Sequence, residues 1–253
     1  MTNIILSGCN GKMGRVITRL VSEDENAKIV AGIDISDFGE NDYPVFKNPM
    51  DCDVSADVIV DFSHPSVFSG LMEFAKAKKI PVIVATTGLS QEQRDALKEY
   101  SKETPVFFSA NMSLGINLLI ALAKKATAIL EENFDIEIVE KHHNQKIDAP
   151  SGTALAIADA ISETLTNAPE YVYDRHSVRK KREKREIGIH AIRGGSIVGE
   201  HQVIYAGQDE TIELKHQATS KEVFAVGAIK AAKFMKAKPA GFYTMDDLIG
   251  EAI

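Results

Sequence analysis

The first 34 residues constrain the fold most, because apolar runs of strand and helix type alternate there around a glycine-rich turn. Residues 3–7 are a short apolar run typical of a buried strand, and Gly8-Cys9-Asn10-Gly11-Lys12-Met13-Gly14 follows directly. Residues 15–22 have helical apolar spacing, and a second strand is predicted at residues 28–33, before Asp34. The order strand, glycine turn, helix, strand and acid is typical of a dinucleotide-binding unit.

The glycine turn and the acid predict where the two halves of a dinucleotide would bind. The spacing is Gly-x-x-Gly-x-x-Gly, and such a turn alone also occurs at an ordinary tight corner; its context favours nucleotide binding. The pyrophosphate would lie at the start of the helix, and Asp34 would bind the adenosine ribose hydroxyls. A carboxylate repels a 2′-phosphate, and Ile35 and Ser36 follow it rather than a basic residue, so NADH is favoured. Lys12 in the turn leaves NADPH open.

The α/β alternation continues, with strands predicted at residues 58–61, 82–85 and 106–108 and helices at 65–78 and 90–101. In an open parallel sheet, ligands bind at the carboxyl ends of the strands. Each loop at such an end is ordinary on its own, but together the loops would line one crevice. We therefore expect the nicotinamide and its ribose near Phe62-Ser63, Ala85-Thr86-Thr87 and Ser109-Ala110-Asn111-Met112.

After residue 113 the pattern changes. A long helix is predicted at residues 114–130 and strands at 187–192, 196–205 and 211–217, the last three antiparallel. The predicted fold class is α/β: a Rossmann-type parallel sheet domain plus an α+β substrate domain with a mostly antiparallel sheet. Residues 1–112 would bind the dinucleotide, and residues 113–222 would bind the substrate. Residues 223–253, helical at first, are expected to return to the first domain.

The most informative local segment is residues 140–154, where a strand predicted at residues 136–140 is followed by His142-His143 and then by Lys146. Ser151-Gly152-Thr153 then opens a helix whose first N–H groups have no partner within the helix. Cationic proton donors beside such N–H groups suit an anion, a carboxylate, that must also receive a proton. Two alternatives are a structural histidine pair with an ordinary cap, and a metal site. Metal is disfavoured because adjacent histidines on an extended segment point apart and Cys9 and Cys52 are distant in sequence.

Composition excludes several classes of function. The chain has 253 residues, 44% of them hydrophobic, and its longest apolar runs are too short for a membrane span or a signal peptide. Two cysteines do not make a disulfide framework, which indicates a reducing cytoplasm. A net charge of −7 disfavours nucleic-acid binding. Residues 175–185 are the basic exception, interpreted as a solvated loop, a surface that meets acidic groups of another subunit, or, less favoured without aromatic residues, an RNA contact.

Several motifs together resemble one family. They are Gly8 to Gly14, Asp61-Phe62-Ser63, Thr86-Thr87-Gly88, Ser109-Ala110-Asn111-Met112-Ser113-Leu114-Gly115, Glu140 to Ala154, and Gly199-Glu200-His201. In this order they resemble the 4-hydroxy-tetrahydrodipicolinate reductase (dihydrodipicolinate reductase) family of lysine biosynthesis through diaminopimelate. The resemblance implies an NADH- or NADPH-dependent oxidoreductase without a metal, which reduces a cyclic dicarboxylate with loss of water. It also implies a homotetramer built through the sheet of the second domain, residues 113–222.

The resemblance further implies roles for individual residues. His142 and Lys146 would be the acid/base pair, with Lys146 favoured as the proton donor. The substrate carboxylates would be bound by His143, Ser151, Gly152, Thr153 and Lys221. The cofactor would contact Gly8, Cys9, Asn10, Gly11, Lys12, Met13, Asp34, Ala85, Thr86, Thr87, Ser109, Ala110, Asn111 and Met112. Three features depart from the pattern: no basic residue follows Asp34, Lys221 stands where an arginine is expected, and the basic loop 175–185 has no clear role in it. Another dehydrogenase and a non-catalytic NAD-responsive regulator are the alternatives.

Overall fold

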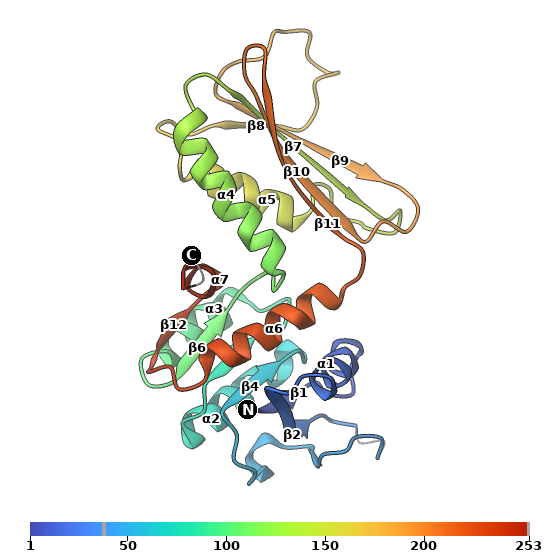
Figure 1. Ribbon diagram of the computed structural model, residues 1–253, viewed down its shortest axis with the longest axis vertical. Coiled ribbons are helices and arrows are strands. Elements are labelled where there is room, and N and C mark those ends of the chain that lie inside the picture. The colour runs from blue at the N-terminus through green and yellow to red at the C-terminus, as the bar shows by residue number, and fades with distance from the viewer. Residues whose placement is uncertain (37–38, 252–253) are drawn as a thin grey trace. The chain divides into compact units, whose positions relative to one another are not determined.

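The computed structural model describes residues 1–36 and 39–251 and divides into two compact units (Figure 1). The first unit contains Met1–Leu114 and the chain from Glu222 onward, and the second contains Gly115–Lys221. The chain therefore leaves the first unit once and returns to it.

The first unit is built on a seven-stranded sheet in which every pair of neighbours is parallel. Its order is β12 (Gly241–Tyr243), β6 (Pro105–Phe108), β5 (Val82–Val84), β4 (Val58–Asp61), β1 (Thr2–Ser7), β2 (Ala27–Ile33) and β3 (Val45–Phe46). This confirms the predicted Rossmann-type class. The edge strands β3 and β12 were not predicted, because two or three residues are too few to show a strand pattern.

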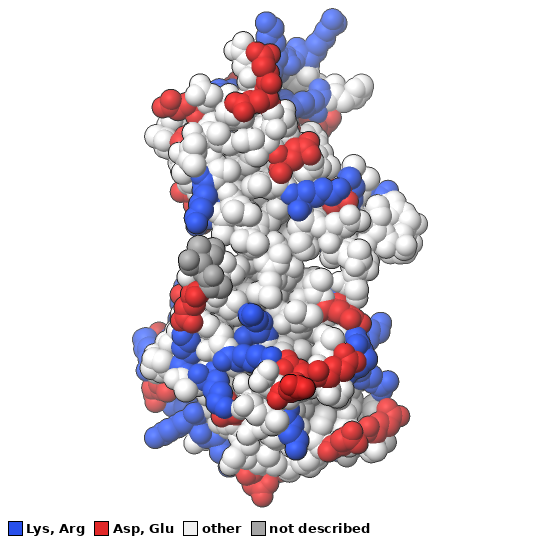
Figure 2. All heavy atoms as spheres, viewed as in Figure 1, with Lys and Arg blue, Asp and Glu red and all other residues white. Residues whose placement is uncertain are grey.

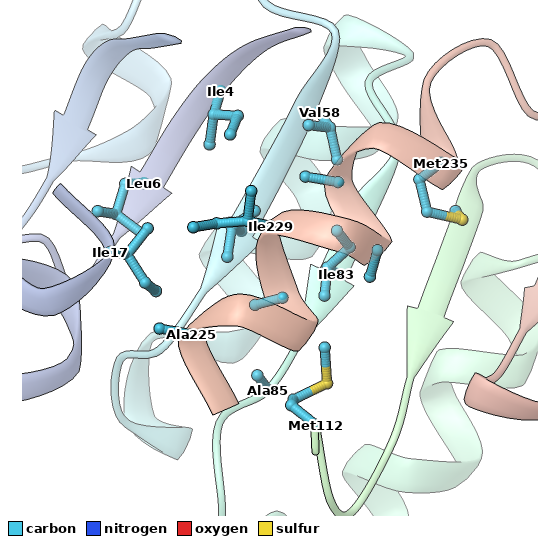
Figure 3. Packing of buried hydrophobic residues seen from close by; sticks show 14 of the residues in the cluster. Ile4, Leu6, Ile17, Val58, Ile83, Ala85, Met112, Ala225, Ile229 and Met235 are labelled. Atoms are coloured by element: carbon cyan, nitrogen blue, oxygen red, sulfur yellow. The ribbon is translucent and has the colours of Figure 1, made fainter. Parts of the chain in front are cut away.

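Helices cover both faces of this sheet, as expected for strands that contain runs of successive apolar side chains. Ile4 and Leu6 of β1 pack with Ile229 of α6 (Glu222–Met235) and Ile17 of α1 (Lys12–Ser22), as Figure 3 shows. Ile5, between them in sequence, belongs to the core on the other face. That core contains side chains of α2 (Phe68–Lys78) and α3 (Gln91–Tyr100), and α7 (Met245–Gly250) completes the unit.

The sequence predicted the start of one helix in this unit correctly and the start of another only in part. Ser90 caps α3, and Gln93 bonds back to the Ser90 N–H in the predicted capping box. The helix predicted from Pro65 begins instead as a 3₁₀ turn, Pro65–Val67, capped by His64, and becomes α-helical only at Phe68. A second 3₁₀ turn, Pro49–Asp51, was not predicted.

The second unit contains a mixed five-stranded sheet covered by two helices. Its order is β11 (Thr211–Ala218), β10 (Gly199–Ala206), β7 (Asp135–His142), β9 (Glu186–Arg193) and β8 (Glu170–Val172). β10 is antiparallel to both of its neighbours, whereas β9 runs parallel to β7 and to β8. The α+β class is confirmed. β9 runs opposite to β10, as predicted for residues 187–192, but its hydrogen-bonded neighbours are the parallel strands β7 and β8 and not β10. Helix α5 (Gly152–Ser162) carries the chain back to the end where β7 began, so the next strands can run parallel to β7.

The basic segment 175–185 lies in the connection between β8 and β9, which are parallel neighbours in this sheet. Arg182 donates from Nε to Glu137 at 3.0 Å and from Nη1 to Asp135 at 2.8 Å. Arg175 donates from Nη1 to Glu186 at 2.7 Å. Two of the predicted basic side chains thus meet acidic groups of their own chain. Figure 2 shows Lys and Arg mixed with Asp and Glu over the visible face of the molecule.

Strand β7 carries the alternation that positions the site. Its buried side chains are every second residue, from Ile136 and Ile138 to Glu140 and His142. The two isoleucines pack against α4 (Leu114–Leu130) and α5 in the core of this unit. Two ionisable side chains therefore extend an apolar face to its carboxyl end. Within the described residues, no helix has the length and apolar character needed to span a membrane.

Candidate active site

The glycine turn after β1 is built so that only glycine fits at two of its positions. Gly8 has φ +79°, and a Cβ there would lie 2.6 Å from the carbonyl oxygen of Phe62. A Cβ at Gly14 would lie 2.2 Å from the carbonyl oxygen of Gly8. Within the described residues no side chain caps α1, whose N-cap is Gly11. The close backbone packing and the uncapped helix start fit the pyrophosphate of a dinucleotide.

Asp34 lies beside this turn and is held there by backbone N–H groups. Its Oδ2 accepts the Asn10 N–H at 3.0 Å, and its Oδ1 accepts the Ser36 N–H at 3.1 Å. Asn41 donates to the Asn10 side chain at 2.9 Å, which braces the same corner. A carboxylate has about four acceptor positions. The described residues use two of those on Asp34 in these bonds, so the geometry suits acceptance of ribose hydroxyl groups as well.

A cavity of about 410 Å³ opens at this corner of the first unit. Its lining includes five residues that the sequence predicted to lie at the cofactor: Gly8, Gly11, Asp34, Phe62 and Ser63. It also includes Lys47, which follows the two-residue strand β3 and carried no signal in the sequence. The volume falls in the range of small-molecule sites, which is about 300–1,000 Å³. The remaining lining residues are Ser7, Ile33, Ile35, Pro49, His64, Ser66, Val67 and Leu71.

A buried carboxyl group joins the strand ends next to this cavity. Asp61 accepts from Thr86 Oγ1 at 2.7 Å and from Ser63 Oγ at 2.5 Å. Burial raises the pKa of Asp61, and the hydrogen bonds from Ser63, Thr86 and Ser7 act in the opposite direction. The hydroxyl of Thr86 is therefore engaged within the protein, whereas Thr87 is exposed and Ala85 is buried. The sequence did not indicate Asp61 as the residue that fixes these loops.

The loop after β6 contains residues predicted to contact the cofactor, and most of their side chains are engaged within the protein. Ser109 Oγ donates to the Asn111 carbonyl at 2.8 Å, and the Asn111 side chain accepts the Ser113 N–H at 2.9 Å. The side chains of Met112 and Cys9 lie in the hydrophobic core, so these two residues offer only backbone atoms to a ligand. Ala110 is exposed in the same loop.

In the second unit, His142 ends β7 and is fixed by a buried glutamate. Its Nδ1 lies 2.6 Å from Oε2 of Glu140, whose side chain is 0% exposed. Arg193 donates to both oxygens of Glu140, at 2.8 Å and 2.6 Å, and the Ser151 N–H donates to Oε1 at 3.0 Å. Burial alone would raise the pKa of Glu140, but the bonds from Arg193, His142 and Ser151 outweigh it and the pKa is lowered.

The start of α5 lies against this cluster. Ser151 is the N-cap, and its Oγ accepts the Ala154 N–H at 3.2 Å while lying 3.1 Å from Nε2 of His201. Burial, followed by the charge of His142, lowers the pKa of His201 to about 4, so this ring is neutral near pH 7. Ser151 is itself buried, which leaves Gly152 and Thr153 as the more accessible residues at the positive end of the α5 dipole.

The loop between β7 and α5 holds the predicted proton donor. Nζ of Lys146 lies 2.8 Å from Oδ1 of Asp148, and the Lys146 N–H bonds to the His143 carbonyl at 3.1 Å. The bond from Lys146 is the main reason why the pKa of Asp148 is lowered. Arg193 donates to the Asp148 carbonyl at 2.7 Å and so fastens the loop to the sheet.

The structure thus brings most of the predicted substrate residues to one end of the second sheet. Lys221 is exposed and follows β11 by three residues; Ala218, which ends β11, pairs with Gly199 beside His142. The sequence did not indicate Arg193, because its contact with Glu140 spans 53 residues. Glu140 could have been found from its position two residues before His142 on the same strand face. No group of three or more His, Cys, Asp or Glu side chains suited to a metal occurs among residues 1–36 and 39–251.

Comparison with known proteins places the chain in a family. The family description "Dihydrodipicolinate reductase, N-terminus" matches residues 2–112, and "Dihydrodipicolinate reductase, C-terminus" matches residues 115–249. A 4-hydroxy-tetrahydrodipicolinate reductase of Clostridium novyi (strain NT) is 55% identical over 249 residues, which cover 98% of each chain. One from Caldanaerobacter subterraneus is 53% identical over the same length and covers 98% of each chain.

A solved structure shares the fold. The dipicolinate-bound dihydrodipicolinate reductase from Paenisporosarcina sp. TG-14 superposes with a TM-score of 0.81 at 23% identity and covers 96% of this chain and 97% of its own. Both halves of the family description match, and the relatives match along nearly the whole chain. The chain therefore belongs to the dihydrodipicolinate reductase family.

Proposed function

We propose that this chain reduces 4-hydroxy-tetrahydrodipicolinate to tetrahydrodipicolinate, with loss of water, in the diaminopimelate route of lysine biosynthesis. Relatives of that name are 53–55% identical over 98% of the chain. The observation that carries the proposal is the end of β7, where His142, Lys146 and the positive end of α5 meet. The positive helix end suits a carboxylate group, and His142 and Lys146 suit a substrate that must also take up a proton.

The reaction consumes one hydride and one proton and releases the ring hydroxyl as water. NADH or NADPH supplies the hydride when bound, and the glycine turn, the uncapped start of α1 and Asp34 would hold it. The second unit supplies the proton and holds the dicarboxylate. We assign the acid/base work to His142 and Lys146.

Electrostatics supports the binding roles in the second unit. Gly152 and Thr153 would offer N–H groups to one substrate carboxylate, and His143 and Lys221 would contribute further polar contacts. Ser151 acts by shaping the helix start, because its hydroxyl is already used as the cap and by His201. Asp148 pairs with Lys146 in the ligand-free chain, so a substrate carboxylate would take over part of that charge pairing.

For the cofactor we propose that NADH is favoured and that NADPH is also accepted. Asp34 suits the ribose hydroxyls of NADH, while Lys47 lines the same cavity and offers a positive charge to a 2′-phosphate. Asp34→Ala should weaken NADH more than NADPH, and Lys47→Ala should weaken NADPH more than NADH. Equal weakening of both cofactors by either change would contradict the assignment of that residue.

We propose further that the chain assembles as a homotetramer through the sheet of the second unit and works in the cytoplasm, where the route to lysine operates. Ile192 on β9 and Ile212 on β11 are exposed apolar side chains on that sheet, which supports an interface there. Light scattering coupled to size-exclusion chromatography tests the assembly. A monomer at micromolar concentration would contradict it.

The test of the activity follows nicotinamide absorbance while a synthase makes the substrate from pyruvate and aspartate semialdehyde. Oxidation of NADH or NADPH that depends on both precursors is the expected result. The rates with the two cofactors give the preference. Nucleotide binding by folded protein without any turnover would contradict the proposal and favour an NAD-responsive regulator.

A further inference from the structure

The carboxylate of Glu140 is completely used by four donors. Arg193 donates to each oxygen, the Ser151 N–H donates to Oε1, and Nδ1 of His142 lies 2.6 Å from Oε2. An ionised carboxylate offers about four acceptor positions and no proton. With Arg193 bound in two parallel bonds the carboxylate remains ionised, so the group at His142 Nδ1 must be an N–H donor.

Burying an ion pair costs free energy of desolvation, which indicates that Glu140 and Arg193 have a role other than stabilising the fold. Ile136 and Ile138 occupy the same face of β7 and show that apolar side chains suit it. Replacement of buried ion pairs by apolar residues is often neutral or stabilising, so a buried Arg–Glu pair is a poor way to stabilise a fold. The pair stands instead where β7 ends in the proposed acid/base histidine.

Arg193 also links the histidine to the loop that carries Lys146. It lies opposite His142 in the parallel register of β7 and β9. Besides Glu140, its Nη2 reaches the carbonyl of Asp148 at 2.7 Å. One guanidinium thus fixes the carboxylate that contacts His142 and the backbone beside Lys146. A lysine could supply the charge but not two parallel bonds and a third in one plane.

The other side of the imidazole is closely confined. A Cβ at Gly199 would lie 3.2 Å from Nε2 of His142, and the ring of His201 stands edge-on at 5.2 Å between centroids. The ring therefore has little freedom to turn or to exchange the positions of its nitrogens. The ionisable groups around His142 and His201 come from all the neighbouring elements: Glu140 on β7, Arg193 on β9, His201 on β10, His216 on β11, and Lys146 in the loop.

We propose that Glu140 and Arg193 are positioning residues for His142: they keep its Nδ1 protonated and leave Nε2 to exchange the proton with the substrate. The proposal rests on the function proposed above only for the step in which the substrate takes part. In that step Nε2 exchanges the proton, with the substrate directly or by way of Lys146, the favoured donor, while Nδ1–H stays bonded to Glu140. The tautomer itself is a property of the ligand-free chain.

The first test therefore uses the full chain without ligands. Long-range ¹H–¹⁵N spectra of the imidazole rings, recorded where the rings are neutral, report which nitrogen carries the proton. The signal of His142 is identified among the seven histidines by its loss in His142→Gln. We expect Nδ1–H in the native chain and a mixture of tautomers in Glu140→Gln. An Nε2–H ring in the native chain, or an unchanged ring in Glu140→Gln, would overturn the proposal.

The second test asks whether Glu140 acts through His142. Glu140→Gln should lower kcat by about 100-fold, within the range of general acid–base catalysis, with the KM for NADH within about twofold. In a His142→Ala background the same change should lower kcat by less than about threefold, because residues that act as one unit are not additive. Equal losses in both backgrounds would overturn the proposal.

Matched variants separate positioning from damage to the fold. Glu137→Gln removes a glutamate of the same strand that also binds arginine and histidine, and it should leave kcat within about twofold. If Glu140→Gln does not fold, Arg193→Lys repeats the same cycle with the charge retained. Absence of turnover by the native chain would contradict the proposed function alone, since the ring spectra still decide the tautomer.

Discussion

Strand β7 carries two clusters of arginine, glutamate and histidine on its opposite faces. Glu137 accepts from Arg182 at 3.0 Å, from Arg175 at 3.1 Å and, at 2.8 Å, contacts His190. Glu140 binds Arg193 and His142 in the same manner but is fully buried, whereas the Glu137 side chain is 21% exposed. In both, burial would raise the pKa of the glutamate and the partners lower it instead.

The two clusters share residue types and differ in their surroundings. The Glu137 cluster binds the segment between β8 and β9, and its neighbours are further ion pairs, such as that of Arg175 with Glu186. The Glu140 cluster lies where β7 ends against the start of α5. An ion-paired histidine therefore does not by itself indicate a catalytic site. The strand end and the adjacent helix start distinguish the two.

The largest contrast should come from removing each histidine. His142→Ala removes a proposed acid/base group and should lower kcat by about 10²–10⁴-fold, while NADH binding, measured by fluorescence titration, stays nearly unchanged. His190→Ala should leave kcat within about twofold. A similar loss of kcat in both variants would mean that the two clusters do not differ in function.

The next contrast is in stability and compares the two arginines. Arg193→Ala leaves a fully buried carboxylate without its main partner, and we expect a loss of about 3–5 kcal/mol in the free energy of unfolding. Arg182→Ala should cost less, about 1–3 kcal/mol, because Glu137 keeps Arg175 and His190 and is partly exposed. Urea denaturation at pH 7 measures both. A larger loss from Arg182→Ala would reverse the assigned order of burial.

Low pH should weaken the ion pair that lies next to the Glu137 cluster, between Arg175 and Glu186. The bond from Arg175 is the main reason why the pKa of Glu186 is lowered from 4.5 to about 2. A lowered pKa in the folded chain means that the stabilisation is complete above pH 4.5 and is lost as the pH falls towards 2. The urea concentration at the midpoint of unfolding should therefore decrease as the pH is lowered from 4.5 to about 2. In Glu186→Gln this decrease should be smaller. A midpoint that is insensitive to pH in this window would contradict the shift.

The parts that the sequence predicted are local in the chain. The glycine turn, α1 and Asp34 follow from periodicity within 34 residues, and the His142 to Thr153 segment is continuous. The parallel pairing of β9 with β7 and the contact of Arg193 with Glu140 depend on the order of strands across the sheet, which no short pattern encodes. Lys47 enters the cavity through a two-residue strand that has no period to detect.

The smallest contrast uses a glycine beside each cluster. A Cβ at Gly188 would lie 1.7 Å from Oε2 of Glu137, so Gly188→Ala must displace the end of that flexible side chain from its partners. We expect a loss of about 1–3 kcal/mol in unfolding free energy and an unchanged kcat. A Cβ at Gly199 would lie 3.2 Å from Nε2 of His142, so the ring need move only a few tenths of an ångström.

For Gly199→Ala we therefore expect a small change in melting temperature with a kcat lowered by about three- to tenfold, because a slight misplacement of a reacting group is costly. Kinetics and thermal melting of the two variants, measured side by side, would separate the clusters by function and not by stability alone. If Gly199→Ala kept full kcat, the confinement of the His142 ring would not matter for the reaction. The positioning role would then rest on the bond to Glu140 alone.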